Sequence, residues 1–101
     1  KYKSKNGFQI HKPGILYYIK IDHNNKVFYK IGITNRSVTT RFSKDELKKI
    51  TILSETTYPR GLDALLEEQS IIQKNRQYLA NDRTILSSGF SEIFTKDIHE
   101  S

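Results

Sequence analysis

The sequence predicts a small α+β domain in which a three-stranded, mostly antiparallel β-sheet is flanked by helices. Three observations lead to this fold class: two neighbouring runs rich in β-branched and aromatic residues, a third such run further along, and a longer segment with apolar residues at helical spacing. At 101 residues, 36% of them hydrophobic, the chain is long enough for one hydrophobic core but not for two. We therefore expect a single domain.

The first two runs, residues 15–21 and 27–33, are separated by the turn-forming sequence His23-Asn24-Asn25. Because β-branched and aromatic side chains favour strands and Asn tolerates tight turns, the two runs are predicted to form a β-hairpin. Residues 1–12, which are polar and basic, are interpreted as a linker or arm, and residues 13–101 as the folded domain. The chain starts with Lys and contains no Met, which leads us to expect a domain taken from a longer protein.

The middle of the chain predicts short helices, a third strand and a longer helix. Apolar residues in the segment 37–50 lie at roughly helical spacing, with an interruption at Ser43 that can cap a new helix, so two short helices are expected. Residues 51–58 are rich in Thr and Ile and predict a strand. Residues 62–78 predict a helix, whose expected apolar face is Leu62, Leu65, Leu66, Ile72 and Leu79.

The charge of the chain indicates an anionic partner. There are 17 Lys and Arg residues against 11 Asp and Glu, a net charge of +6, which favours nucleic acid. A membrane partner is not expected, because no apolar run approaches bilayer length and the most apolar helical stretch carries Glu67 and Glu68. The chain has no cysteine, so a disulfide framework and a cysteine zinc site are both excluded.

Two short motifs occupy the predicted hairpin. The first strand contains Gly14-Ile15-Leu16-Tyr17-Tyr18-Ile19, and the second contains Lys30-Ile31-Gly32. Arg41 follows nine residues after Gly32, a Glu lies in the later helix, and Gly89-Phe90-Ser91-Glu92-Ile93-Phe94 stands near the end. This ordered set, from about residue 13 to 98, resembles the GIY-YIG endonuclease superfamily, and more closely its phage and homing-type branch with a Lys-Ile-Gly second motif. The resemblance implies the GIY-YIG nuclease fold and hydrolysis of DNA phosphodiester bonds.

The resemblance assigns Tyr17 to the family's first catalytic tyrosine, which helps to activate or position the attacking water. A phenol is a weak base at neutral pH unless a nearby cation stabilises the phenolate, and Lys30 is the candidate cation. Tyr18 points to the opposite face of the strand and is expected to contact DNA. The alternative is that Tyr17 and Tyr18 are ordinary strand residues and Lys30 an exposed lysine.

Arg41 matches the arginine that holds the scissile phosphate in this family. A planar guanidinium can meet two non-bridging oxygens at once, where phosphoryl transfer builds up charge. Arg36, four residues after Gly32, is assigned to the DNA backbone, with a solvated surface position as the alternative.

Glu68 is the expected metal ligand, because helical phase places it at the edge of the apolar face while Glu67 turns away. The resemblance implies a single Mg²⁺ there, with Mn²⁺ as a substitute. The alternative is a helix-edge Glu paired with a lysine. Glu92 is a supporting residue, either near the metal or as a structural contact, at a position near which better-known relatives carry a catalytic asparagine.

The leading hypothesis is thus a metal-dependent DNA endonuclease that acts inside a bacterial or phage-infected cell. A domain this small has no evident recognition helix, so a further DNA-recognition module is expected in the full-length protein. One alternative is a catalytically degenerate GIY-YIG-fold module that binds DNA. Another, an RNA-binding or assembly domain, rests only on charge and aromatic content.

Overall fold

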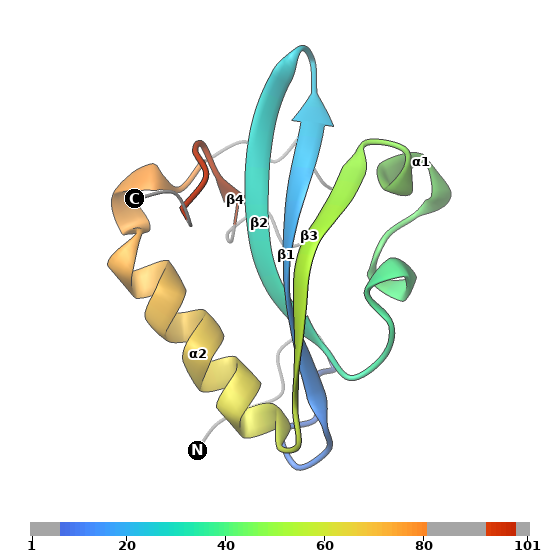
Figure 1. Ribbon diagram of the computed structural model, residues 1–101, viewed down its shortest axis with the longest axis vertical. Helices are drawn as coiled ribbons and strands as arrows, with labels where there is room; N and C mark the ends of the chain where they lie inside the picture. Colours follow the sequence, from blue (N-terminus) through green and yellow to red (C-terminus); the bar gives the residue numbers. More distant parts are fainter. Residues whose placement is uncertain (1–6, 81–92, 99–101) are drawn as a thin grey trace.

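The computed structural model describes residues 7–80 and 93–98 (Figure 1). The strands are β1 (Gly14–His23), β2 (Lys26–Thr34), β3 (Ile50–Tyr58) and β4 (Ile93–Phe94). The helices are the 3-10 helix η1 (Val38–Arg41), α1 (Lys44–Leu47), α2 (Gly61–Lys74) and the 3-10 helix η2 (Arg76–Tyr78). The α+β class that the sequence predicts is confirmed.

The β1–β2 hairpin confirms the strongest local prediction. Its two-residue turn is Asn24-Asn25, and both residues have positive φ, 51° and 64°. Two consecutive left-handed residues are the conformation of a type I′ turn, whose twist matches that of the strands, and Asn adopts it more readily than most residues. The turn fixes the register in which Tyr17 lies opposite Gly32 and Ile19 opposite Lys30.

Within residues 7–80 and 93–98 the sheet contains four strands rather than the three that the sequence predicts. Its order is β3-β1-β2-β4, and every neighbouring pair is antiparallel. The additional strand, Ile93–Phe94, pairs with Tyr29 and Lys30 of β2. A strand of two residues is too short to show alternation of polar and apolar side chains, so no periodic pattern predicts it.

The two faces of the sheet are covered by different helices, which lie on opposite sides of the strands in Figure 1. Helix α2 packs on the face formed by Leu16, Tyr18, Ile31 and Ile33, which we call the α2 face. The other face carries Tyr17, Ile19, Lys30 and Gly32, and we call it the motif face. Val38 of η1 packs there against Tyr17, Ile19 and Ile21.

The helical segments follow the sequence prediction with two differences. Segment 37–50 does form two short helices, but η1 is a 3-10 helix; α1 begins with a capping box between Ser43 and Glu46. The predicted helix 62–78 ends at Lys74, and η2 follows it. At this break the side chain of Asn75 donates a hydrogen bond of 2.8 Å to the backbone carbonyl of Ile71. A side chain thus satisfies one of the carbonyl groups in the last turn of α2.

Residues 7–12, expected to belong to a linker or arm, pack against the domain. Phe8 is 4% exposed and contacts a cluster that includes Ile33 and Ala64. The carbonyls of Ile10 and Lys12 accept hydrogen bonds from the first backbone N–H groups of α2, at 2.8 and 2.6 Å. These bonds satisfy donors that a helix start leaves without intrahelical partners, and the preceding residue supplies no side-chain cap.

Candidate functional site

Both hairpin motifs place their chemical groups on the motif face. Side chains directly opposite each other in an antiparallel pair lie on the same face, so the register brings Tyr17, Gly32 and Lys30 together. Lys30 is a diagonal neighbour of Tyr17, a spacing of roughly 7 to 8 Å between backbone positions that a long side chain can bridge. The predicted pairing of Tyr17 with Lys30 is therefore sterically feasible.

Tyr17 is packed more deeply than the sequence suggested. Its side chain is 1% exposed, and its ring meets Phe42 edge to face with centroids 6.0 Å apart. The ring occupies space that a side chain at position 32 would need: a Cβ on Gly32 would lie 3.0 Å from Cε1 of Tyr17 and closer still to Cζ and Oη. Gly32 of the second motif therefore makes room for the tyrosine of the first.

Lys30 is also buried, at 3% exposure, between Ile19 of β1 and Ile93 of β4 in the register of the sheet. The alternative interpretation of Lys30 as an exposed strand lysine is therefore wrong. A buried ammonium group is unfavourable unless other groups compensate it, and Lys30 does have an interaction partner in the structure. A buried lysine does not contribute to the solubility of the surface, so a functional role is a reasonable expectation for Lys30.

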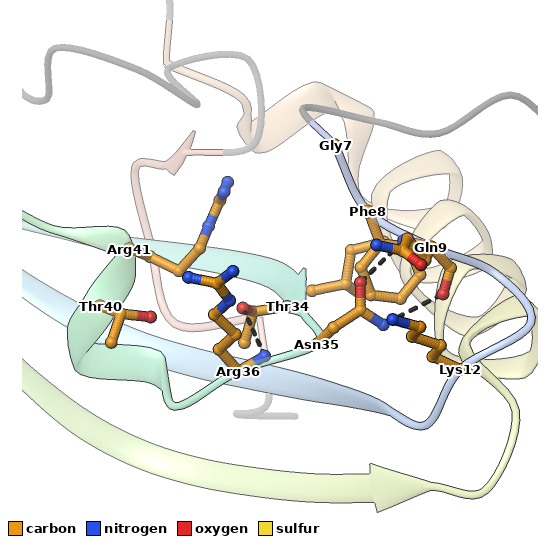
Figure 2. Close-up of a pocket in the computed structure, with 10 residues that line it drawn as sticks. Gly7, Phe8, Gln9, Lys12, Thr34, Asn35, Arg36, Thr40 and Arg41 are labelled. Carbon is orange, nitrogen blue, oxygen red and sulfur yellow. Dashed lines mark hydrogen bonds between the residues drawn. The ribbon is translucent and has the colours of Figure 1, made fainter.

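A polar pocket of about 440 Å³ opens where β2 ends. Figure 2 shows the side chains of Arg36 and Arg41 next to each other on one side of it, with Thr34 beside Arg36. Lys12, Asn35 and Gln9 lie on the other side, and the remaining lining residues are Gly7, Phe8, Ile33 and Thr40. None of these residues is acidic, so the pocket is suited to an anion.

The loop between β2 and η1 is held in place by its own polar side chains. The hydroxyl of Thr34 accepts a hydrogen bond of 3.1 Å from the backbone N–H of Arg36. Thr40 donates through its hydroxyl, at 2.7 Å, to the carbonyl of Ser37. These contacts fix the backbone from which both arginines project, so their shared position is a property of the loop.

The two arginines have no carboxylate partner among the described residues. In addition, the Nε atom of Arg41 is buried and makes no hydrogen bond there. A guanidinium group offers five N–H donors, and a phosphate is a natural acceptor for several of them at once. The sequence assigned different roles to Arg36 and Arg41, but the structure brings both to one pocket.

Glu68 lies at the middle of the buried side of α2, not at its edge. Ala64 and Leu65 precede it by about one turn and Ile71 and Ile72 follow by the same distance, and all four pack toward the sheet. Leu66, expected on the apolar face, is 42% exposed. The buried face of α2 is therefore rotated about the helix axis relative to the expected one. The helix approaches the sheet through its small residues Gly61 and Ala64. Glu67 is exposed as expected.

The surroundings of Glu68 bear on the expected Mg²⁺. One carboxylate is enough protein ligand for Mg²⁺, which keeps several waters and also binds substrate phosphates. However, Glu68 is 1% exposed, accepts a hydrogen bond of 3.0 Å from the amide of Gln69, and does not line the pocket. The described residues also contain no group of three or more potential metal ligands. In this conformation the position of Glu68 does not fit a hydrated Mg²⁺.

Tyr18, expected to contact DNA, is instead a buried structural residue. Its side chain is 4% exposed and stacks on Tyr29, with ring centroids 5.8 Å apart. Its hydroxyl donates to a carboxylate oxygen of Asp97 at 2.7 Å and accepts from the N–H of Ile98 at 3.0 Å. Burial, and then the hydrogen bond to Asp97, raise the pKa of Tyr18 well above its ordinary value of 10.0. Because this face of β1 is covered by α2, the described conformation does not present Tyr18 to a DNA ligand.

The sequence missed the contribution of Lys12 and Asn35 to the pocket. Residues 1–12 were interpreted as a linker or arm, and Asn35 was given no role. The apolar pair Phe8 and Ile10 inside this basic segment was the available signal that it packs on the domain. Glu92, the supporting residue, lies outside the described residues.

The comparisons with known proteins add no relative. Family models, curated proteins and solved structures were searched, and none of the three searches found a match to this chain. Within the part of the chain that the structure describes, no helix has the length and apolar character that crossing a bilayer requires. The function is therefore inferred from the motifs, the charge and the geometry of the pocket.

Proposed function

We propose that this chain is a metal-dependent DNA endonuclease domain of the GIY-YIG type, acting as the catalytic part of a homing-type or phage endonuclease. The observation that carries the proposal is the pair of guanidinium groups, Arg36 and Arg41, in a pocket directly after the strand that carries Lys30 and Gly32, with no acidic residue among its described lining. A separate DNA-recognition module and an intracellular place of action belong to the same proposal.

The arginines have the clearest role in this chemistry. Hydrolysis of a phosphodiester increases the negative charge on the non-bridging oxygens, and a fixed guanidinium group stabilises that charge. Arg41 is the better candidate for the scissile phosphate, because its Nε is already withdrawn from solvent and a desolvated charge interacts more strongly. Arg36 is exposed and is suited to a neighbouring part of the DNA backbone.

Tyr17 and Lys30 are suited to handling the proton of the attacking water. The ammonium group of Lys30 favours the phenolate form of a nearby tyrosine and so makes that tyrosine a better base. Both side chains are almost fully buried, so the proposal requires the motif face to become accessible when DNA binds. A bound metal would supply charge stabilisation at the phosphate, and the resemblance makes Glu68 its ligand, but the burial of that carboxylate does not fit this role in the present conformation.

The second candidate is a DNA-binding module that has the fold without the activity. The burial of Tyr17, Lys30 and Glu68 favours this alternative, since all three groups are within the interior while the arginines of the pocket remain available. No observation favours the RNA-binding or assembly alternative over these two. The two candidates make the same prediction for DNA binding and opposite predictions for cleavage.

A plasmid-nicking assay distinguishes them. Supercoiled plasmid is incubated with the chain in Mg²⁺ or Mn²⁺, with EDTA as the metal control, and binding is measured in parallel on a short labelled duplex. Arg76→Ala is a matched variant, because Arg76 is an exposed arginine of η2 that does not line the pocket. Nicking that requires metal and Arg41 but not Arg76 supports the endonuclease. Binding without nicking supports the second candidate, and absence of both rejects the two together.

A further inference from the structure

The side chain of Asn35 connects the loop after β2 to residues 7–13. Its Oδ1 accepts a hydrogen bond of 2.7 Å from the N–H of Gln9. Its Nδ2 donates to the carbonyl of Gln9 at 3.0 Å and to that of Pro13 at 2.9 Å. One amide group thus makes three hydrogen bonds to the backbone of a segment that lies more than 20 positions earlier in the sequence, and Figure 2 shows it at the wall of the pocket.

Residues 8–12 are also held by close packing against Gly14 and Gly61. The ring of Phe8 lies against two glycines: a Cβ on Gly14 would be 2.8 Å from its Cζ, and a Cβ on Gly61 would be 2.9 Å from it. The Gly61 position would also clash with the carbonyls of Gln9 and Lys12. Both glycines therefore permit an approach that any larger residue would prevent. The backbone of residues 8–12 is consequently a fixed part of the domain.

Lys12 is the charged residue that this arrangement brings to the pocket. Its backbone carbonyl is bonded to α2, whereas its side chain is exposed and lines the pocket opposite Arg36 and Arg41. Three cations from two separate segments thus surround one space whose described lining contains no acidic residue. Neighbouring phosphates repel each other, and a cation on each side of the space reduces that repulsion.

We propose that residues 8–12 and Asn35 form the second wall of a site for two consecutive phosphates of a DNA strand. Arg36 and Arg41 hold one phosphate, Lys12 binds the next, and Asn35 is a positioning residue that keeps Lys12 at the required place. The inference rests on the proposed DNA-binding function and deepens it, because it identifies a polynucleotide backbone rather than an isolated anion as the ligand.

The salt dependence of DNA binding tests the role of Lys12. Each phosphate that a cation neutralises contributes about 0.9 to the slope of log K against log salt for duplex DNA. Lys12→Ala should therefore weaken binding of a short fluorescent duplex and lower this slope by about 0.9. The substitution keeps the backbone carbonyl that caps α2, so the fold should be retained.

Lys26→Ala is the matched control for net charge. Lys26 is exposed at the hairpin turn, about 26 Å along β2 from Thr34 at the usual rise of a strand. Its removal should leave the slope nearly unchanged. If the parent binds DNA and the two lysine variants behave alike, the second wall is refuted while the proposed function stands. If the parent does not bind DNA at all, the proposed function fails, and the inference fails with it.

A double-mutant cycle tests the role of Asn35. If Asn35 acts through Lys12, Asn35→Ala should lower the affinity and the slope in the parent but have little further effect in the Lys12→Ala background. A purely structural role predicts a lower melting temperature, with effects on affinity that add to those of Lys12→Ala. Additive effects on affinity would thus overturn the positioning role, even if the variant is less stable.

Discussion

Gly32→Ala tests the packing of Tyr17 against the second motif. The added Cβ would lie 3.0 Å from Cε1 and nearer to Cζ and Oη of the buried ring. Optimal carbon–carbon separations are about 3.5 to 4.0 Å, so the ring or the strand must move by at least about 0.5 Å. Overpacking of this kind costs about 1 to 3 kcal/mol, which in a domain of this size corresponds to a fall in melting temperature of roughly 4 to 24 °C.

The same substitution in a Tyr17→Leu background shows whether the ring of Tyr17 causes the loss of stability. Tyr17→Leu removes the distal ring atoms that the new methyl group meets, so Gly32→Ala in this background should be neutral or even stabilising. The gain is expected because Ala in a strand loses less conformational freedom on folding than Gly, by about 0.5 to 1 kcal/mol. Urea unfolding, monitored by circular dichroism, gives the free energy of unfolding of the parent, of the two single variants and of the double variant. If Gly32→Ala has the same effect in both backgrounds, the ring does not occupy the space over Gly32.

Further predictions concern the pocket, the helix and Tyr18. Arg41→Ala should lower plasmid cleavage by about 10² to 10³-fold, the usual effect of removing one fixed group that stabilises transition-state charge, whereas Arg36→Ala should mainly weaken duplex binding. A rate-critical Arg36 with a silent Arg41 would reverse these assignments. Glu68→Ala should destabilise the fold by about 1 to 3 kcal/mol in thermal unfolding, because it removes the acceptor of the Gln69 amide and truncates a side chain on the buried side of α2, while Glu67→Ala should stay within about 0.5 kcal/mol. Equal effects would contradict the helical phase. Tyr18→Phe should leave DNA binding unchanged but reduce stability by about 1 to 3 kcal/mol. Because the folded-state pKa of Tyr18 is raised above 10.0, its contribution is complete below pH 10.0 and is lost as the pH rises further. Unfolding measured from pH 8 to 11 should therefore show a steeper alkaline loss of stability in the parent than in Tyr18→Phe.

Local sequence signals predicted the parts of the fold that are locally determined. The hairpin follows from β-branched runs around Asn24-Asn25, whose positive φ angles suit Asn. The start of α1 follows from Ser43, whose side chain accepts the N–H of Glu46. Both features depend on residues within a few positions of each other. Their physical causes are therefore visible in the sequence itself.

The failures concern contacts between distant segments. The buried side of α2 was misplaced because hydrophobic spacing weighted Leu66, whereas the helix approaches the sheet through Gly61 and Ala64. Burial of Phe8 depends on two glycines that are 47 positions apart. For the candidate site, the register brought Tyr17 and Lys30 to one face as expected, but the depth at which both are buried depends on tertiary packing. No local pattern reports such packing.

The capping of α2 by the carbonyls of Ile10 and Lys12 has a consequence for how the chain folds. The first two N–H groups of the helix gain partners only when a segment about 50 residues earlier has docked, and bringing such distant residues together, which the pairing of β1 with β3 begins, carries an entropic penalty of several RT. Late formation of this end of α2 should therefore be a feature of the folding pathway. A shortened version that starts at Pro13 would keep every strand of the hairpin, yet its helix would fray from the end nearest the pocket.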